Sequence, residues 1–226
     1  MSKSHWLALS MIPGIGGVTA RRLVERFGSV EAVFEAPDEE LRQVPRLTAE
    51  VISRLRAVSL EALEEELASL TEEGLGVVTW DDDEYPANLR QANDAPPLLF
   101  LRGDLQVGDE RAVAIVGTRE PTTQGVDIAE MLARELAARG LTIVSGLALG
   151  IDTAAHRGAL QARGGRTLAV PGCGLRAIHP RENVPLAEKI VRRGALLSEL
   201  HPNTPARGPN LMARDRIISG LSRAVI

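Results

Sequence analysis

The residues best suited to chemistry follow a short apolar run in the middle of the chain. Ser145 and Gly146 come directly after the run 141–144. Asp152 and His156 lie four residues apart shortly afterwards, a spacing that places both side chains on the same side of a helix. They would either perform acid–base chemistry or fix the preceding turn by hydrogen bonds. We favour the structural role, with Asp152 as the helix N-cap.

Small-residue turns follow four of the apolar runs that we expect to be strands. The carboxyl ends of parallel strands share one edge of a sheet, which is where ligands bind. Small residues keep such an edge open, and the N-termini of the following helices make it electropositive. The sequence therefore predicts one shared anion pocket. Its turns are Gly117-Thr118-Arg119, Ser145-Gly146, Gly172-Cys173-Gly174 and Ser198-Glu199.

Arginine side chains supply positive charge near these turns. The guanidinium of Arg119 suits a phosphodiester, with an ion pair to Glu199 or Asp152 as the alternative. Further arginines in the later loops would extend a basic stripe along several phosphates. Each of them alone is more often a solvated side chain than a ligand. They are Arg176, Arg181, Arg214 and Arg216.

The charge of the chain is divided unevenly along its length. Residues 1–106 carry 10 Lys and Arg against 19 Asp and Glu, whereas residues 107–226 carry 16 against 11. Only the second part therefore favours a polyanion. All six aromatic residues precede residue 107, so a nucleic-acid site in the second part would use charge and backbone contacts rather than aromatic stacking.

Several other chemistries are disfavoured. No G-x-G-x-x-G or Walker pattern follows an expected strand, and the four histidines lack the spacing of metal ligands. We therefore expect no cofactor and no metal. Cys173 with His179 lacks an orienting acid for nucleophilic catalysis, and we interpret it as a packed thiol. No secretory leader or membrane span is evident, which favours a cytoplasmic protein.

The elements that must position these residues alternate between strand and helix from residue 107 onward. This pattern predicts a doubly wound, mostly parallel α/β sheet. The chain stops inside the last expected strand, so we expect it to be a C-terminally truncated fragment. The expected strands are 112–116, 141–144, 167–170, 195–200 and 223–226, and the expected helices are 123–139, 152–160, 185–193 and 214–221.

The first part of the chain has a different character. Residues 1–70 read as a small all-helical domain, and 71–106 as a connector that adds edge elements to the sheet. Two expected helices flank the turn 13–16, whose glycines resemble those of a helix-hairpin-helix motif. A weaker second copy covers 41–55. Because this domain is acidic, we favour a structural or protein-docking role over DNA contact.

Together these motifs resemble the DNA-processing protein A family (DprA, also called Smf) of natural transformation. The resemblance spans about 75–226, and the N-terminal domain is similar to the family's sterile-alpha-motif-like module. The connector 85–103 also matches the sequence pattern of this family. The segments that carry the resemblance are 114–125, 145–156, 168–175 with Pro180 and Asn183, 194–199 and 214–222.

The resemblance implies an extended Rossmann-like fold and a protein that is not an enzyme. Members bind incoming single-stranded DNA, protect it and help to load the RecA recombinase. The family's basic DNA-binding positions fall on Arg119, Arg181 and Arg214. Beside them, we interpret Asp152, His156 and Glu199 as structural supports of the pocket. The resemblance also implies a homodimer in the full-length protein, whose dimer surface and optional winged-helix domain would lie past Ile226.

Three positions depart from the family pattern, which usually has Tyr at His179, Asn at Asp215 and commonly an acid at Arg176. We expect Asp215 to pair with Arg119 or Arg214. The alternative function is a nucleoside-monophosphate phosphoribohydrolase-like enzyme on the same fold, using Glu199 and Arg119. The absence of a Pro-Gly-Gly-x-Gly-Thr-x-x-Glu segment disfavours that alternative.

Overall fold

The computed structural model describes residues 3–226, which form two compact units. The first unit comprises residues 3–83 and Asn93–Leu99, and the second comprises Glu84–Ala92 and Phe100–Ile226. The second unit carries the four small-residue turns.

The first unit is mainly helical. Side-chain oxygens of Ser29, Thr48 and Ser59 accept hydrogen bonds from backbone N–H groups and so begin three of its helices. Trp6 and Leu23 are among the apolar side chains that form its core. Its elements are α1 (Lys3–Met11), α2 (Gly17–Phe27), α3 (Val30–Glu35), α4 (Asp38–Leu41), α5 (Ala49–Arg56), α6 (Leu60–Glu72) and β1 (Gly76–Thr79).

The expected turn between the first two helices is present. Gly14 has a φ of +98°, a conformation that favours glycine. At Gly17, an added Cβ would lie 2.1 Å from the carbonyl oxygen of Ala95, so only glycine fits there. The second, weaker copy separates α4 from α5 and places Arg46 at a φ of +72°.

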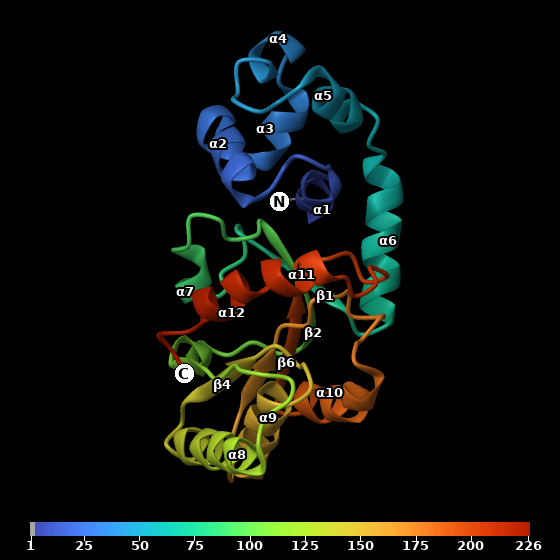
Figure 1. The fold of residues 1–226 in the computed structure, drawn as a ribbon. Coiled ribbons are helices and arrows are strands. Elements are labelled where there is room, and N and C mark those ends of the chain that lie inside the picture. The colour runs from blue at the N-terminus through green and yellow to red at the C-terminus, as the bar shows by residue number, and fades with distance from the viewer. Residues whose placement is uncertain (1–2) are drawn as a thin grey trace. The chain divides into compact units, whose positions relative to one another are not determined.

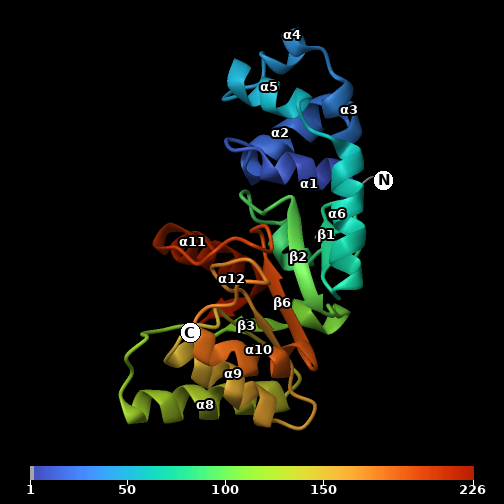
Figure 2. The same ribbon diagram turned by 90° about the vertical axis from the view of Figure 1, so that its right-hand side faces the viewer.

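The second unit contains most of the α/β sheet (Figures 1 and 2). The strand order in this unit is β2-β6-β5-β4-β3-β7. Strands β3 to β7 pair in parallel, whereas β2 pairs with β6 antiparallel. This confirms the predicted mostly parallel α/β fold. The strands are β2 (Leu98–Gly103), β3 (Ala112–Ala114), β4 (Thr142–Ser145), β5 (Thr167–Ala169), β6 (Gly194–Ser198) and β7 (Ala224–Val225).

Helices cover both faces of this sheet. In both views α8, α9 and α10 lie on one side, and α11 and α12 lie on the other (Figures 1 and 2). Small residues bring α8 and α9 close together, because a Cβ at Gly158 would lie 2.1 Å from the carbonyl oxygen of Glu130. The helices are α7 (Ala87–Arg90), η1 (Val107–Glu110), α8 (Thr123–Ala138), α9 (Ile151–Gln161), η2 (Arg181–Asn183), α10 (Val184–Val191), α11 (Gly208–Ala213) and α12 (Asp215–Leu221).

Two features differ from the sequence prediction. Helix α11 was not expected, because Gly208 and Pro209 read as loop residues, although proline in a first helical turn is well tolerated. The N-cap of α9 is Gly150 rather than Asp152, because Gly150 has a φ of +81° and Asp152 already lies in the first helical turn.

Within residues 3–226, no helix is long and apolar enough to span a membrane.

Candidate nucleic-acid interface

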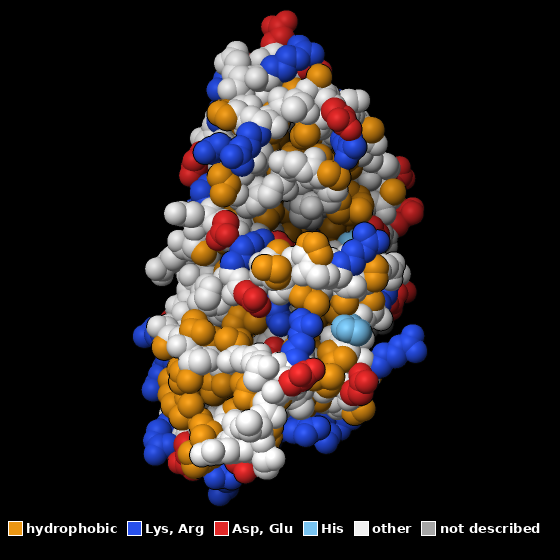
Figure 3. Space-filling view, viewed as in Figure 1, with side chains coloured by type: hydrophobic (Ala, Val, Ile, Leu, Met, Phe, Trp, Pro, Cys, Tyr) orange, Lys and Arg blue, Asp and Glu red, His pale blue; other side chains and the backbone are white. Residues whose placement is uncertain are grey.

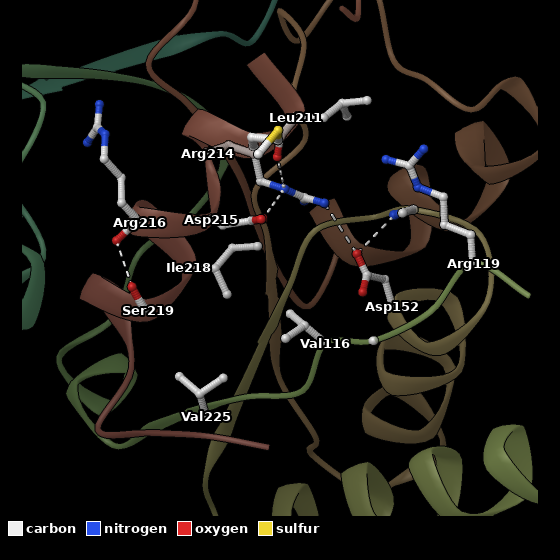
Figure 4. Close-up of a pocket in the computed structure, with 13 residues that line it drawn as sticks. Val116, Arg119, Asp152, Leu211, Arg214, Asp215, Arg216, Ile218, Ser219 and Val225 are labelled. Carbon is white, nitrogen blue, oxygen red and sulfur yellow. Dashed lines mark hydrogen bonds and ion pairs between the residues drawn. The ribbon is translucent and has the colours of Figure 1, made fainter. Parts of the chain in front are cut away.

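A cavity of about 620 Å³ opens at the carboxyl edge of the sheet (Figure 4). The parts of the chain that form it are the turn after β3, the β4–α9 turn with the start of α9, the helices α11 and α12, and β7. We call this cavity the edge pocket. Its walls include Val116, Gly117, Arg119, Ala148, Asp152, Leu211, Met212, Arg214, Arg216 and Ile218.

The Arg214 side chain forms the buried wall of the edge pocket and is only 7% exposed. Its Nη1 donates to the carbonyl oxygen of Val170 at 2.6 Å, and its Nε donates to that of Leu211 at 3.2 Å. Its Nη2 lies 3.5 Å from Oδ2 of Asp152, and its Nε lies 2.9 Å from Oδ1 of Asp215. All three nitrogens therefore bind the protein itself, and Asp215 pairs with Arg214, as expected.

Gly146 makes room for this arginine. A Cβ at Gly146 would lie 1.4 Å from Nη1 of Arg214. No side chain fits beside the guanidinium at that distance. The glycine of the β4–α9 turn therefore admits an arginine of the same chain, rather than an external phosphate.

Asp152 ties the β4–α9 turn to the arginine. Its Oδ2 accepts hydrogen bonds from the backbone N–H groups of Gly146 at 3.2 Å and Ala148 at 3.3 Å. Burial raises the pKa of the Asp152 carboxyl, while the Arg214 guanidinium and these N–H groups act in the opposite direction. Asp152 is thus a buried brace of the turn.

His156 lies behind the turn and does not bind it. Its Nδ1 lies 2.8 Å from Oγ1 of Thr167, whose hydroxyl donates to the carbonyl oxygen of Ile143 at 2.7 Å. Because that hydroxyl proton is already used, Nδ1 must carry the imidazole proton. Burial, together with the charge of Arg214, lowers the pKa of His156 to about 3. His156 therefore holds α9 to β5. The expectation that it fixes the turn by hydrogen bonds is wrong, because its Nδ1 faces Thr167 rather than the turn.

The predicted arginines fall into two groups. Arg119 and Arg181 are exposed, and neither side chain forms a hydrogen bond or ion pair with any residue in 3–226. Arg216 pairs with Glu199, and Arg176 donates to Oδ1 of Asn203 at 3.5 Å. Arg119 and Arg181 are therefore the arginines available to a ligand.

The other predicted small residues are packed by the chain itself. Ser145 is buried and donates to the carbonyl oxygen of Ile115 at 2.6 Å. A Cβ at Gly172 would lie 2.6 Å from the Leu211 side chain, and one at Gly174 would lie 2.2 Å from the carbonyl oxygen of His201. The same addition at Gly117 would meet the Ile151 side chain at 2.8 Å, although Gly117 itself lines the edge pocket.

The edge pocket thus brings together five of the predicted site residues and excludes others. Gly117, Arg119, Asp152, Arg214 and Arg216 line it, whereas Thr118, Ser145, Gly172, Gly174, Arg176, Arg181, His156 and Glu199 do not. Thr118 instead accepts at its carbonyl oxygen from the N–H of Ile151 at 3.2 Å.

Sequence reasoning missed the apolar wall of the edge pocket. Leu211, Met212 and Ile218 belong to α11 and α12, and Met212 is 78% exposed. Apolar side chains are usually assigned to a core, so only the unexpected helix α11 reveals that Met212 faces solvent.

A model of the family described as DNA recombination-mediator protein A matches residues 76–226. The chain belongs to this family. A model of the SAM-like helix-hairpin-helix tandem matches residues 7–58, which agrees with the two turns of the first unit.

Relatives in the DNA recombination-mediator protein A family match most of the chain. Protein Smf of Synechocystis is 36% identical over 99% of this chain and 57% of its own length. DNA processing protein DprA of Bacillus subtilis is 40% identical over 71% of this chain and 54% of its own length. The chain therefore spans a little over half the length of these relatives.

Solved structures from the family have the same fold. The X-ray structure of DprA from Streptococcus pneumoniae matches with a TM-score of 0.81 and 33% identity, covering 97% of this chain and 74% of that one. DprA from Helicobacter pylori matches with a TM-score of 0.59 and 34% identity, over 66% of this chain and 67% of that one. The latter structure is described as showing a single-stranded DNA binding mode.

Proposed function

We propose that this chain binds single-stranded DNA at the edge pocket and performs no catalysis there. The observation that carries the proposal is the position of Arg119, an exposed guanidinium without a protein partner at the rim of a recessed cavity. A free guanidinium forms paired, charge-assisted hydrogen bonds with a phosphodiester. The single-stranded DNA mode described for the H. pylori relative supports the same ligand.

The shape of the edge pocket favours a single strand over a duplex. The phosphates and bases of a single strand can turn separately into a recess, whereas those of a duplex are held in a rigid double helix. Val116, Leu211 and Ile218 provide an apolar wall for a base, and Arg119 provides the charge for its phosphate. No aromatic side chain is needed for this mode.

The remaining predicted residues have supporting roles in this proposal. Arg181 binds a neighbouring phosphate, and Arg176 and Arg216 add positive potential from their protein-bound positions. Arg214, Asp152 and Gly146 form the rigid floor. The residues that shape the surrounding turns are Gly117, Thr118, Ser145, Gly172, Gly174 and Glu199, and His156 supports them indirectly by holding α9 to β5.

The wider role follows from family membership. We infer a cytoplasmic protein of natural transformation that protects incoming single-stranded DNA and helps to load RecA, acting as a homodimer when full length. We infer that 107–226 is the DNA-binding domain, 71–106 a connector and 1–70 a docking module. The phosphoribohydrolase alternative loses support because Glu199 pairs with Arg216 and does not line the pocket that holds Arg119.

The proposal is tested by titrating the purified chain with oligo-dT and with a duplex of equal length, over a range of salt concentrations. We expect tighter binding of the single strand and a linear fall of log K with log salt. Equal or tighter binding of the duplex would contradict the proposal. In parallel, release of adenine from AMP that is lost in Glu199→Ala would replace it with the enzymatic alternative.

A further inference from the structure

A second cavity, of about 400 Å³, lies between α9 and α10, away from the edge pocket. We call it the α9–α10 groove. Arg157, Leu160 and Gln161 come from α9, and Pro185, Leu186 and Lys189 come from α10. None of these residues lines the edge pocket.

The two cations of the groove are available to a ligand. Arg157 and Lys189 are exposed, and neither side chain forms a hydrogen bond or ion pair with any residue in 3–226. Two basic residues near the groove are already paired: Arg102 of β2 pairs with Glu188 at 2.7 Å, and Arg193, just past α10, donates to two carbonyl oxygens at the end of α9. Arg157 and Lys189 are therefore the cations that line the groove and are open to a ligand.

Exposed positive charge continues beyond the groove. Arg163 follows α9 and Arg192 follows α10, and both side chains are exposed without a partner in the described part of the chain. Figure 3 shows blue Lys and Arg side chains over the α9–α10 region, as well as in the middle of the same face below α11. Glu182 is the one acidic residue that lines the groove, so its net charge is positive.

The groove is held rigidly at both ends. At one end, Nδ2 of Asn183 donates to the carbonyl oxygen of Leu147 at 2.9 Å and to Oγ1 of Thr153 at 2.8 Å. At the other end, Arg193 donates to the carbonyl oxygens of Leu160 and Ala162, both at 2.7 Å. The spacing between α9 and α10 is thereby fixed before any ligand arrives, which lowers the entropy cost of binding.

The groove also begins where the proposed DNA path leaves the edge pocket. Arg181 and Glu182 belong to η2, which Asn183 attaches to the β4–α9 turn that forms the pocket floor. A strand whose phosphate contacts Arg181 would therefore reach the groove at Glu182 and then meet Arg157 and Lys189.

We propose that the α9–α10 groove binds a second stretch of the same single-stranded DNA, through phosphate contacts with Arg157 and Lys189. This proposal rests on the DNA binding proposed for the edge pocket. Leu160, Pro185 and Leu186 form an apolar floor, and the side-chain amide of Gln161 is engaged by Glu130, so we propose that the groove binds DNA without sequence preference.

The test compares a short oligo-dT of about 8 nucleotides with a long one of about 30. The double variant Arg157→Gln/Lys189→Gln should bind the long strand about tenfold more weakly at low salt, and the salt slope should fall by about 1.4, the value for two lost single-strand contacts. Its affinity for the short strand should stay within about twofold of the wild type, because the edge pocket is intact.

The control is Arg134→Gln/Arg139→Gln, which removes the same charge from exposed positions in α8 and at its C-cap, where both arginines pair with Glu135 outside the groove. It should leave the long-strand slope within about half a unit of the wild type. Equal losses for both strand lengths, or equal losses in the control, would overturn the proposal.

Two further results separate this proposal from neighbouring ones. If the wild type binds neither strand, the function proposed for the edge pocket fails first. Polyglutamate serves as a probe for an acidic protein segment. If the double variant binds the long strand as tightly as the wild type but no longer binds polyglutamate, the groove binds an acidic segment, and the DNA proposal is overturned.

Discussion

A side chain at position 146 and the guanidinium of Arg214 cannot occupy the same space, since a Cβ on Gly146 would lie 1.4 Å from Nη1. Gly146 in the β4–α9 turn therefore leaves the space that the buried Arg214 guanidinium occupies. Through Asp152, Val170 and Leu211, that cation joins β5, α11 and the turn into one floor. The shape of the edge pocket therefore depends on a residue distant in the sequence.

Replacing Gly146 with alanine should displace Arg214. Because this leaves Asp152 as a buried charge without its partner, we expect the free energy of unfolding to fall by about 3–5 kcal/mol. Chemical denaturation measures this free energy directly. Gly108→Ala is the matched control, because nothing lies within 4 Å of its added Cβ, and it should change the free energy of unfolding by less than about 0.5 kcal/mol. Similar values for the two variants would contradict the claim that Gly146 is needed to accommodate Arg214.

The pairing of Asp152 with Arg214 should appear as coupling in a double-mutant cycle. Asp152→Asn and Arg214→Met each leave one buried partner uncompensated, whereas the double variant removes both charges. We expect the double variant to be more stable than the sum of the single effects predicts, by about 1–3 kcal/mol. Strict additivity would show that the contact at 3.5 Å carries no net energy.

The buried imidazole of His156 should make stability depend on pH. The pKa of His156 in the folded chain is about 3, below the ordinary 6.5. Between these two pH values His156 is protonated in the unfolded chain but not in the folded chain. Stability should therefore fall as the pH drops from about 6.5 toward 3, with His156 contributing a slope of about 1.4 kcal/mol per pH unit.

His156→Asn provides the comparison for this slope. Asparagine keeps a donor near the Nδ1 position for Oγ1 of Thr167 but does not titrate. Denaturation of both proteins between about pH 6 and pH 4.5 should show a shallower slope in the variant. Parallel curves would mean that His156 is not the responsible group.

The fold was predictable because each central strand is a short buried run that ends in a turn of small residues. The exposure of Arg119 at the sheet edge also followed from its place after such a turn. Helix α11 was not predictable. Gly208 and Pro209 are typical of loops, and Met212 shows no apolar periodicity with its neighbours.

The burial of Arg214 was equally hidden, because a charged residue is by default assigned to the surface. The signal that it is buried lies elsewhere in the sequence, in the missing Cβ of Gly146 and the acid at Asp152. Only the three-dimensional arrangement joins these residues. For the same reason, the sequence predicts an open anion site at Gly172 and Gly174. In the structure Leu211 covers Gly172 and Pro202 covers Gly174.

The central claim is that Arg119 binds a DNA phosphate at the edge pocket. The most direct measurement is the affinity of Arg119→Gln for oligo-dT across a range of salt concentrations, with Arg134→Gln on α8 as the charge control. We predict about tenfold weaker binding at low salt and a salt slope smaller by about 0.7, with unchanged thermal stability. Wild-type affinity and slope in Arg119→Gln would contradict the account.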